Sequence, residues 1–192
     1  MSLINVFVRQ DSVSMFSDTR LSIGSNRIGD VAKVFAVPHL NAVIGVRGPM
    51  KALQVVVDMV VPLADDFKGL RAALSRFSEL SAAQMLKGNP VPAEIDIFVA
   101  GWNDGPVAYF LANHDGHGIR PFRLIDIPYA LVTPRVDDGL FQELADEDPE
   151  FSAMRKVIDA QVATYAVVGG AITCTTIHQD QITMRRFSSY HR

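Results

Sequence analysis

Hydrophobic and polar residues alternate at the start of the chain, and this alternation predicts β-strands. Apolar residues share one face across residues 4–8, a polar turn follows, and residues 13–16 continue the pattern, which is typical of a β-hairpin. Glycine and asparagine mark residues 24–30 as a loop. A second strand pair is predicted at residues 31–37 and 42–46.

The spacing of apolar residues then changes to every three or four positions, which predicts amphipathic helices. One helix is expected at residues 49–61, with a proline in its first turn, and a second at residues 67–80. The sequence at residues 87–90 ends this second helix, because glycine suits a helix cap and proline cannot continue a helix. Helical spacing returns at residues 151–165, with a shorter helix expected at residues 139–145.

Strand patterns also return twice. Residues 95–102 and 106–111 read as two strands joined by the hairpin turn Asn-Asp-Gly at residues 103–105. A further extended stretch is expected at residues 121–127. The final segment, residues 171–187, alternates and is rich in β-branched side chains, with a turn near its middle.

The order of these elements, strands then a helix pair, repeated and closed by strands, predicts the fold class. Strands grouped between paired helices favour antiparallel sheets with helices outside over an alternating parallel array. We therefore expect an α+β protein with one domain spanning residues 1–192. Two sheets stack face to face, and a helix pair covers each outer side, giving a four-layer helix–sheet–sheet–helix (αββα) sandwich.

Composition is that of a globular protein and excludes several classes of function. Of the 192 residues, 48% are hydrophobic and 20% are charged, and the formal net charge is −3. No run rich in lysine or arginine is present, so we expect no nucleic-acid partner. The single cysteine, Cys174, cannot form an internal disulfide and reads as a small buried residue. Neither a signal peptide nor an apolar run of about 20 residues is present, so we expect a cytoplasmic protein without a membrane span.

The residues most suggestive of chemistry lie near the ends of the first strands. Lys33 stands in an otherwise apolar segment, and alternation places it on one face with Phe35, in or beside the core. Asp18 can neutralise it there, and a desolvated lysine beside a carboxylate tunes the surroundings of a nucleophile. The plainer alternative for Asp18 and Arg20 is a structural ion pair at a hairpin end. Gly48 equally suits a tight turn from strand to helix.

Two histidines in a glycine-rich loop, His114 and His117, invite comparison with a metal site. The sequence offers no third ligand at a suitable spacing, so we interpret the segment as an ordinary turn and expect no metal. Arg47 can be a contact for an acidic substrate group, but we interpret it as a solvated side chain. No phosphate-binding glycine loop or nucleophile elbow is present, and we expect no cofactor.

Several of these segments together resemble the proteasome β-subunit family, which includes the bacterial two-component protease and related ring- or spiral-forming peptidases. They are Ser-Asp-Thr-Arg at residues 17–20, the single Lys33 opening the next strand, and the glycine-ended strand at residues 42–48. Residues 99–116 are similar to a hairpin of that family, and Val-Gly-Gly-Ala at residues 168–171 is similar to its helix-to-strand junction. The resemblance runs in the same order over nearly the whole chain and implies the layered fold named above.

The resemblance also implies an activity, that of an N-terminal-nucleophile hydrolase. After removal of the initiator methionine, Ser2 is the nucleophile, and its α-amine, with an ordinary pKa of about 8, is the base. On the same reading Lys33 favours the ionised hydroxyl, Asp18 holds Lys33, and the Gly48 N–H stabilises the oxyanion, with Arg20 beside them. The substrate is a peptide or small amide, and the implied assembly is a homo-oligomeric ring or spiral. Whether an ATPase cooperates stays open.

Departures from the family pattern leave a second hypothesis open. Family peptidases use threonine more often than serine, and Tyr165 and Val168 stand where they place an acid and a hydroxyl. Met1-Ser2-Leu3 also reads as either the natural start or an added leader. The alternative function is a catalytically inactive proteasome-like assembly or structural subunit.

Overall fold

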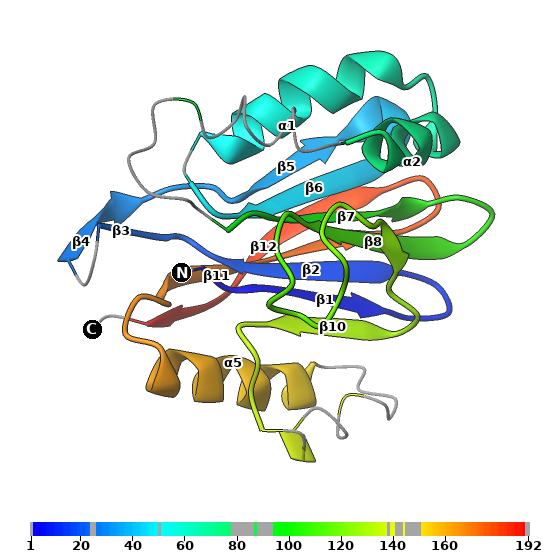
Figure 1. Ribbon diagram of the computed structural model, residues 1–192. Coiled ribbons are helices and arrows are strands. Elements are labelled where there is room, and N and C mark those ends of the chain that lie inside the picture. The colour runs from blue at the N-terminus through cyan, green and yellow to red at the C-terminus, as the bar shows by residue number, and fades with distance from the viewer. Residues whose placement is uncertain are drawn as a thin grey trace.

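Antiparallel strands dominate the fold (Figure 1). The computed structural model describes residues 2–23, 26–49, 51–77, 87, 94–137, 139–140, 144 and 151–190. Within these residues the strands form two five-stranded sheets and one two-stranded sheet. Each pairing in all three sheets is antiparallel.

The first large sheet has the strand order β10-β1-β2-β11-β12. Its strands are β1 (Ile4–Val8), β2 (Val13–Asp18), β10 (Ala130–Thr133), β11 (Gly170–Ile177) and β12 (Ile182–Tyr190). Val8 pairs with Val13 at the tight end of the β1–β2 hairpin, so the hairpin predicted at the start of the chain is confirmed. The predicted final hairpin is confirmed by β11 and β12.

The second large sheet has the order β5-β6-β7-β8-β9, and a small sheet, β3-β4, extends beside the two large ones. The strands of the second sheet are β5 (Val34–Val37), β6 (Ala42–Arg47), β7 (Asp96–Trp102), β8 (Pro106–Ala112) and β9 (Ile125–Asp126). The small sheet consists of β3 (Arg20–Ile23) and β4 (Asn26–Asp30). The predicted turn between β7 and β8 is confirmed, with Asp104 and Gly105 both at positive φ.

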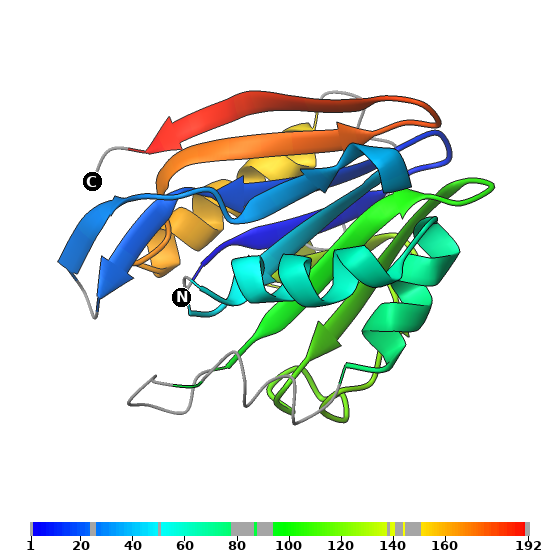
Figure 2. The same cartoon turned by 90° about the horizontal axis from the view of Figure 1, so that it is seen from above.

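Three α-helices of known extent flank the sheets: α1 (Ala52–Val60), α2 (Phe67–Ser75) and α5 (Ser152–Thr164). Short 3₁₀ turns, η1 (Pro38–Leu40) and η2 (Val61–Leu63), precede β6 and follow α1. The helices α1 and α2 cover the sheet that holds β5 and β6, and α5 lies against the sheet that holds β1, as two perpendicular views show (Figures 1 and 2). Among the described helices, none is long and apolar enough to span a membrane.

Apolar side chains fill three regions. One lies between α1, α2 and the sheet of β6, the second between α5 and the sheet of β1, and the third between the two large sheets. The sheets approach closely at Gly45, where an added methyl group would lie 2.7 Å from Sδ of Met15. Glycine suits this position, because an added side chain would require Met15 and Ile4 to shift within the core.

A buried polar pair joins α5 to β1. The amide groups of Asn5 and Gln161 hydrogen-bond to each other in both directions, at 2.8 and 3.0 Å. Gln161 also donates to the carbonyl of Pro134 at 2.6 Å, and the Thr133 N–H donates to Asn5 at 3.0 Å. Both amide side chains are fully buried, so these partners offset the cost of removing them from water.

The predicted four-layer αββα sandwich is wrong as a description of this architecture. The described strands form three sheets rather than two, and the described part of the chain holds only three short α-helices of known extent. A pair of helices covers one sheet, whereas α5 is the one helix of known extent against the other. The third sheet arises because residues 26–30, interpreted as loop from their glycine and asparagine, pair with β3 instead.

The bounds of several strands also differ from the predicted ones. The strand predicted at residues 31–37 begins only at Val34, and the one predicted at residues 121–127 shrinks to β9. Short β10 was not predicted at all. The expected end of the second helix at residues 88–90 lies outside the described residues, as do residues 78–80 and most of the predicted helix at 139–145.

Candidate active site

Four of the five residues predicted to act together line one small pocket. Ser2, Arg20, Lys33 and Gly48 surround a space of about 70 Å³. Ser2 precedes β1, Arg20 opens β3, Lys33 precedes β5 and Gly48 follows β6, so four separate strands place them. The N-terminal end of the chain lies where these strand ends converge (Figure 1). Met1 lies outside the described residues.

Asp18, the fifth predicted residue, ends β2 and lies beneath this pocket. Its Oδ1 accepts a hydrogen bond from Nζ of Lys33 at 2.6 Å and from the N–H of Leu3 at 2.8 Å. Its Oδ2 accepts the N–H of Gly169 at 3.3 Å. Asp18 is fully buried and Lys33 is 7% exposed, so the pair is shielded from solvent. One carboxylate thus connects the start of the first strand with the lysine.

Burial governs the proton affinity of this pair. Loss of hydration raises the pKa of Asp18, and the nearby Lys33 and the backbone N–H groups oppose that rise. Loss of hydration likewise lowers the pKa of Lys33, opposed by the charge of Asp18. Each group therefore needs the other to remain ionised, since either charge alone is unfavourable in this environment.

Lys33 is buried for a different reason from the one its sequence context indicates. Alternation placed Lys33 and Phe35 on one inward face, but Phe35 is 44% exposed. Residues 31–33 precede the strand, and the carbonyl of Lys33 accepts a hydrogen bond from the N–H of Val46 at 3.1 Å. This bond fixes the segment against β6, and the side chain enters the space beside Asp18.

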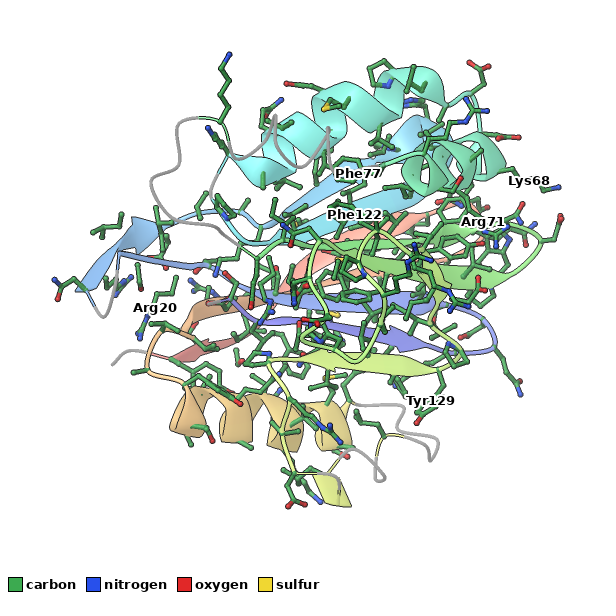
Figure 3. All side chains as sticks on the ribbon, viewed as in Figure 1. Arg20, Lys68, Arg71, Phe77, Phe122 and Tyr129 are labelled. Carbon is green, nitrogen blue, oxygen red and sulfur yellow. The ribbon has the colours of Figure 1, made fainter. Side chains whose placement is uncertain are left out.

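Arg20 and Gly169 pack against each other on another side of the pocket. Nη1 of Arg20 donates to the carbonyl of Ala166 at 2.8 Å, so the guanidinium reaches the segment after α5 (Figure 3). Gly169 has φ of +148°, and an added methyl group there would lie 3.0 Å from Cζ of Arg20. Arg20 is only 6% exposed. Its position supports a role in holding the loop whose N–H group reaches Asp18.

Gly48 lies at a sharp change of direction after β6. Its φ is +148°, and an added methyl group would lie 2.9 Å from the carbonyl oxygen of Glu94. Both the conformation and the crowding require glycine. The tight turn predicted for Gly48 is therefore reason enough for a glycine here. Gly48 also lines the pocket that contains Ser2.

Tyr165 and Val168, the two positions that depart from the pattern of the resembled family, are not among the residues that line the pocket at Ser2. The hydroxyl of Tyr165 donates to the carbonyl of Arg135 at 2.9 Å. Val168 is buried among the apolar residues between α5 and its sheet. Neither residue supplies a carboxylate or hydroxyl to the pocket.

Nothing in the sequence indicated another polar group near Lys33, formed by Thr19 and Asp30. The Thr19 hydroxyl donates to Asp30 at 2.8 Å and accepts the N–H of Ala171 at 3.0 Å. Hydrogen bonds from Thr19 and then Arg27 hold the pKa of Asp30 below its usual range. Thr19, Asp30 and Lys33 border a second pocket of about 220 Å³. Asp30 belongs to the unpredicted small sheet, so its sequence position gave no signal of this contact.

A second charged cluster is formed by Arg47, the residue before Gly48, together with Asp96 and two histidines. Arg47, interpreted as solvated, is 12% exposed and donates through Nε to Oδ2 of Asp96 at 2.5 Å. The interpretation is wrong because Arg47 and Asp96 are register partners across β6 and β7. His114 and His117 contact the same carboxylate.

Comparison with known proteins identifies the fold. No protein-family model and no curated protein matches the chain by sequence. Among solved structures, a mutant of Anbu from Hyphomicrobium sp. strain MC1 matches with a TM-score of 0.71 and 14% sequence identity, over 98% of this chain and 88% of that one. Anbu is a bacterial proteasome-like protein, and the chain has a proteasome-like fold. At this identity the likeness concerns the fold alone.

Proposed function

We propose that the protein is an N-terminal-nucleophile amidohydrolase, acting as a peptidase through Ser2 once Met1 has been removed. One observation carries this proposal: Ser2, Lys33 and Gly48 line the same pocket, and Asp18 links Lys33 to the backbone of Leu3. A serine hydroxyl, a buried ammonium group and a glycine backbone are the components that amide cleavage needs in one place.

Each group has a defined part in the proposed reaction. The free α-amine of Ser2 accepts the proton of the Ser2 hydroxyl, and the Lys33 ammonium stabilises the resulting alkoxide. The alkoxide attacks the carbonyl carbon of the amide, and the N–H of Gly48 stabilises the negative oxygen that forms. The C–N bond then breaks as the leaving amine takes the proton from the Ser2 ammonium. Water, deprotonated by the same amine, hydrolyses the ester and regenerates Ser2.

Asp18 is a positioning residue in this scheme. Because burial lowers the pKa of Lys33, the lysine needs a negative partner to remain charged near neutral pH. The hydrogen bond from the Leu3 N–H to Asp18 also fixes the backbone next to Ser2. Arg20 contributes indirectly, because it packs against the loop that carries Gly169.

The surroundings are consistent with a peptide or small amide as substrate. The pocket at Ser2 is small, and the second pocket, which Lys33 also lines, offers room for a substrate side chain. The proteasome-like fold supports a homo-oligomeric ring or spiral as the working assembly.

A second function, that of an inactive structural or assembly subunit, is favoured by one observation. The side chains of Tyr165 and Val168 are engaged elsewhere, so the acid and hydroxyl that support the nucleophile in family peptidases have no counterpart at these positions. A chain of this kind would retain the fold and its assembly surfaces without cleaving substrate.

Intact-mass spectrometry followed by covalent labelling distinguishes the two functions. Protein made from its own start codon is expected to lack Met1, and a β-lactone or epoxyketone probe is expected to add one probe mass. Lys33→Ala is expected to reduce labelling at least 100-fold, because the alkoxide loses its neighbouring charge. Retained Met1, or labelling that is unchanged in Lys33→Ala, would support the structural function instead.

Ser22 provides a matched control, because it is a serine that lines the same pocket as Ser2. Ser2→Ala is expected to abolish the adduct, whereas Ser22→Ala is expected to leave it in place. If the adduct is lost in Ser22→Ala and retained in Ser2→Ala, the reactive hydroxyl is that of Ser22 and the proposal is wrong.

A further inference from the structure

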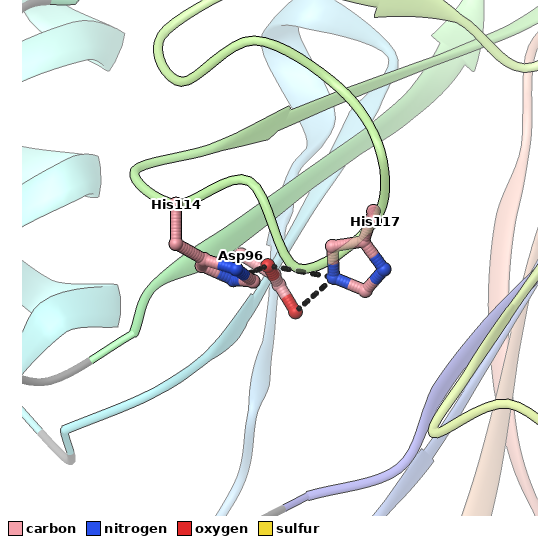
Figure 4. Close-up of side chains that lie close together, drawn as sticks. All are labelled: Asp96, His114 and His117. Carbon is pink, nitrogen blue, oxygen red and sulfur yellow. Dashed lines mark hydrogen bonds and ion pairs between the residues drawn. The ribbon is translucent and has the colours of Figure 1, made fainter.

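Asp96, His114 and His117 come together at one end of the β7–β8 hairpin (Figure 4). Asp96 begins β7 and is paired with Ala112 at the end of β8. The two histidines follow in the loop after β8, so the hairpin register returns them to the beginning of β7. One potential ligand atom from each residue lies within 4.8 Å of the other two.

The two histidine rings lie on either side of the Asp96 carboxylate, and Nε2 of each is directed at it (Figure 4). Oδ1 of Asp96 lies 2.8 Å from Nε2 of His114 and 3.2 Å from Nε2 of His117. Around a tetrahedral zinc ion with bonds of about 2.0–2.1 Å, neighbouring ligand atoms lie about 3.3 Å apart. The two separations from Oδ1 need to widen by at most about half an ångström to admit such an ion. The ligand atoms of the two histidines lie within 4.8 Å of each other, so they too are close enough to share one ion after adjustment.

Arg47 orients the carboxylate so that it faces both histidines. Oδ2 of Asp96 accepts the hydrogen bond from Nε of Arg47 and also lies 3.2 Å from Nε2 of His117, whereas Oδ1 contacts both histidines. A metal-binding carboxylate is commonly oriented by a second hydrogen-bonded partner of this kind. The charge of Arg47 also offsets that of Asp96, so we expect affinity in the micromolar rather than the nanomolar range.

The loop that carries the histidines permits access and adjustment. Asp96 is fully buried, whereas His114 and His117 are 13% and 22% exposed, so an ion can approach from the histidine side. Nδ1 of His114 accepts the N–H of Gly116 at 3.1 Å, which places the proton of the neutral ring on Nε2. Metal binding at Nε2 moves that proton to Nδ1 and breaks this contact. Gly116 and Gly118 give the loop the backbone freedom for that change.

We propose that Asp96, His114 and His117 form a binding site for a divalent transition-metal cation of the Zn²⁺ class. Two imidazoles and one carboxylate are a ligand set that this class of ion accepts, and three protein ligands leave a further coordination position open. The site is separate from the pocket at Ser2 and does not depend on the proposed peptidase function. The alternative is a hydrogen-bonded network in which both histidines simply donate to Asp96.

Titration of chelator-treated protein with Co²⁺, followed by visible absorption, tests the proposal. One equivalent is expected to give the intense bands of a tetrahedral or five-coordinate ion, and Zn²⁺ is expected to displace them. His117→Gln separates the two explanations, because glutamine can still donate a hydrogen bond to Asp96 but its amide is a poor metal ligand. We expect at least a 10-fold loss of Co²⁺ affinity in this variant and in His114→Ala.

The matched control is His178→Ala, which removes a histidine whose ring contacts the carbonyl of Asp11 instead. Its Co²⁺ affinity is expected to equal that of the unmodified protein. Circular dichroism of each metal-free variant shows that a lost signal reflects a lost ligand rather than a lost fold. No saturable absorption up to about 1 mM Co²⁺, a concentration that corresponds to very weak binding, would overturn the proposal. Equal affinity in His117→Gln and the unmodified protein would overturn it too.

Discussion

Asp18 and Asp96 are both fully buried carboxylates, but their surroundings differ in one respect that governs their chemistry. Asp18 has a lysine that is 7% exposed and two backbone N–H groups as partners. Asp96 has an arginine that is 12% exposed and two histidines that solvent reaches more easily. The first cluster lies beside the start of the chain, and the second lies at the end of a hairpin.

The choice of cation separates the two clusters. The amine of lysine loses its proton readily when buried, whereas the guanidinium of arginine stays charged. The pair at Asp18 can therefore change its protonation as its surroundings change, which suits a group beside a nucleophile. At Asp96 the guanidinium of Arg47 orients the carboxylate toward the two histidines, which suits binding. Two buried carboxylates of the same type thus support different proposals.

The largest effect is expected from breaking the first pair. Asp18→Asn leaves the Lys33 amine buried without a negative partner, and we expect a loss of about 3 kcal/mol in the free energy of unfolding. Urea denaturation measures this loss. The double variant Asp18→Asn with Lys33→Met removes the cation as well and is expected to recover most of the stability. Equal stability of the single and double variants would show that the charge of Lys33 does not matter.

Breaking the second pair is expected to cost less. Asp96→Asn removes the negative partner of Arg47, but that side chain is partly exposed and can recover some hydration. Loss of a charged hydrogen-bond acceptor predicts about 2 kcal/mol by the same denaturation experiment. A loss larger than that of Asp18→Asn would reverse the comparison between the two clusters.

The smallest expected effect concerns the glycine that contacts Arg20. Gly169→Ala combines an unfavourable backbone conformation with a methyl group 3.0 Å from Cζ of Arg20. Gly105→Ala is the matched control, because Gly105 has nearly the same φ, +150°, and nothing within 4 Å of the added methyl group. We expect thermal unfolding to show about 1 kcal/mol more destabilisation for Gly169→Ala than for Gly105→Ala. An equal loss would mean that displacing Arg20 has no cost.

Local sequence patterns predicted much of the secondary structure but not the way in which it is assembled. The hairpins β1–β2, β7–β8 and β11–β12 were identified because turn residues and alternation lie within a few positions of each other. The small sheet was missed because its residues, rich in glycine and polar side chains, show no inward-facing pattern. Their pairing depends on neighbours that only the folded chain provides.

The candidate sites follow the same division. The association of Asp18 with Lys33 was predicted, because a lysine in an apolar segment requires a partner. The contact of Arg47 with Asp96 was not predicted, because it depends on the register between β6 and β7, which no turn in the sequence sets. The contact of the histidines with Asp96 follows from the predicted β7–β8 hairpin, which pairs Asp96 with Ala112. It was missed because the search for a third ligand considered only spacing along the chain and not the strand opposite.

The two hydrogen bonds between the side-chain amides of Asn5 and Gln161 have a consequence for the beginning of the chain. Apolar contacts alone tolerate a helix sliding lengthwise over a sheet, since one aliphatic side chain can replace another. A two-way amide contact tolerates only one alignment, because any offset would leave several buried polar atoms without partners. Asn5 is three positions after Ser2, so this contact sets how far the terminal residues extend beyond the edge of the sheet.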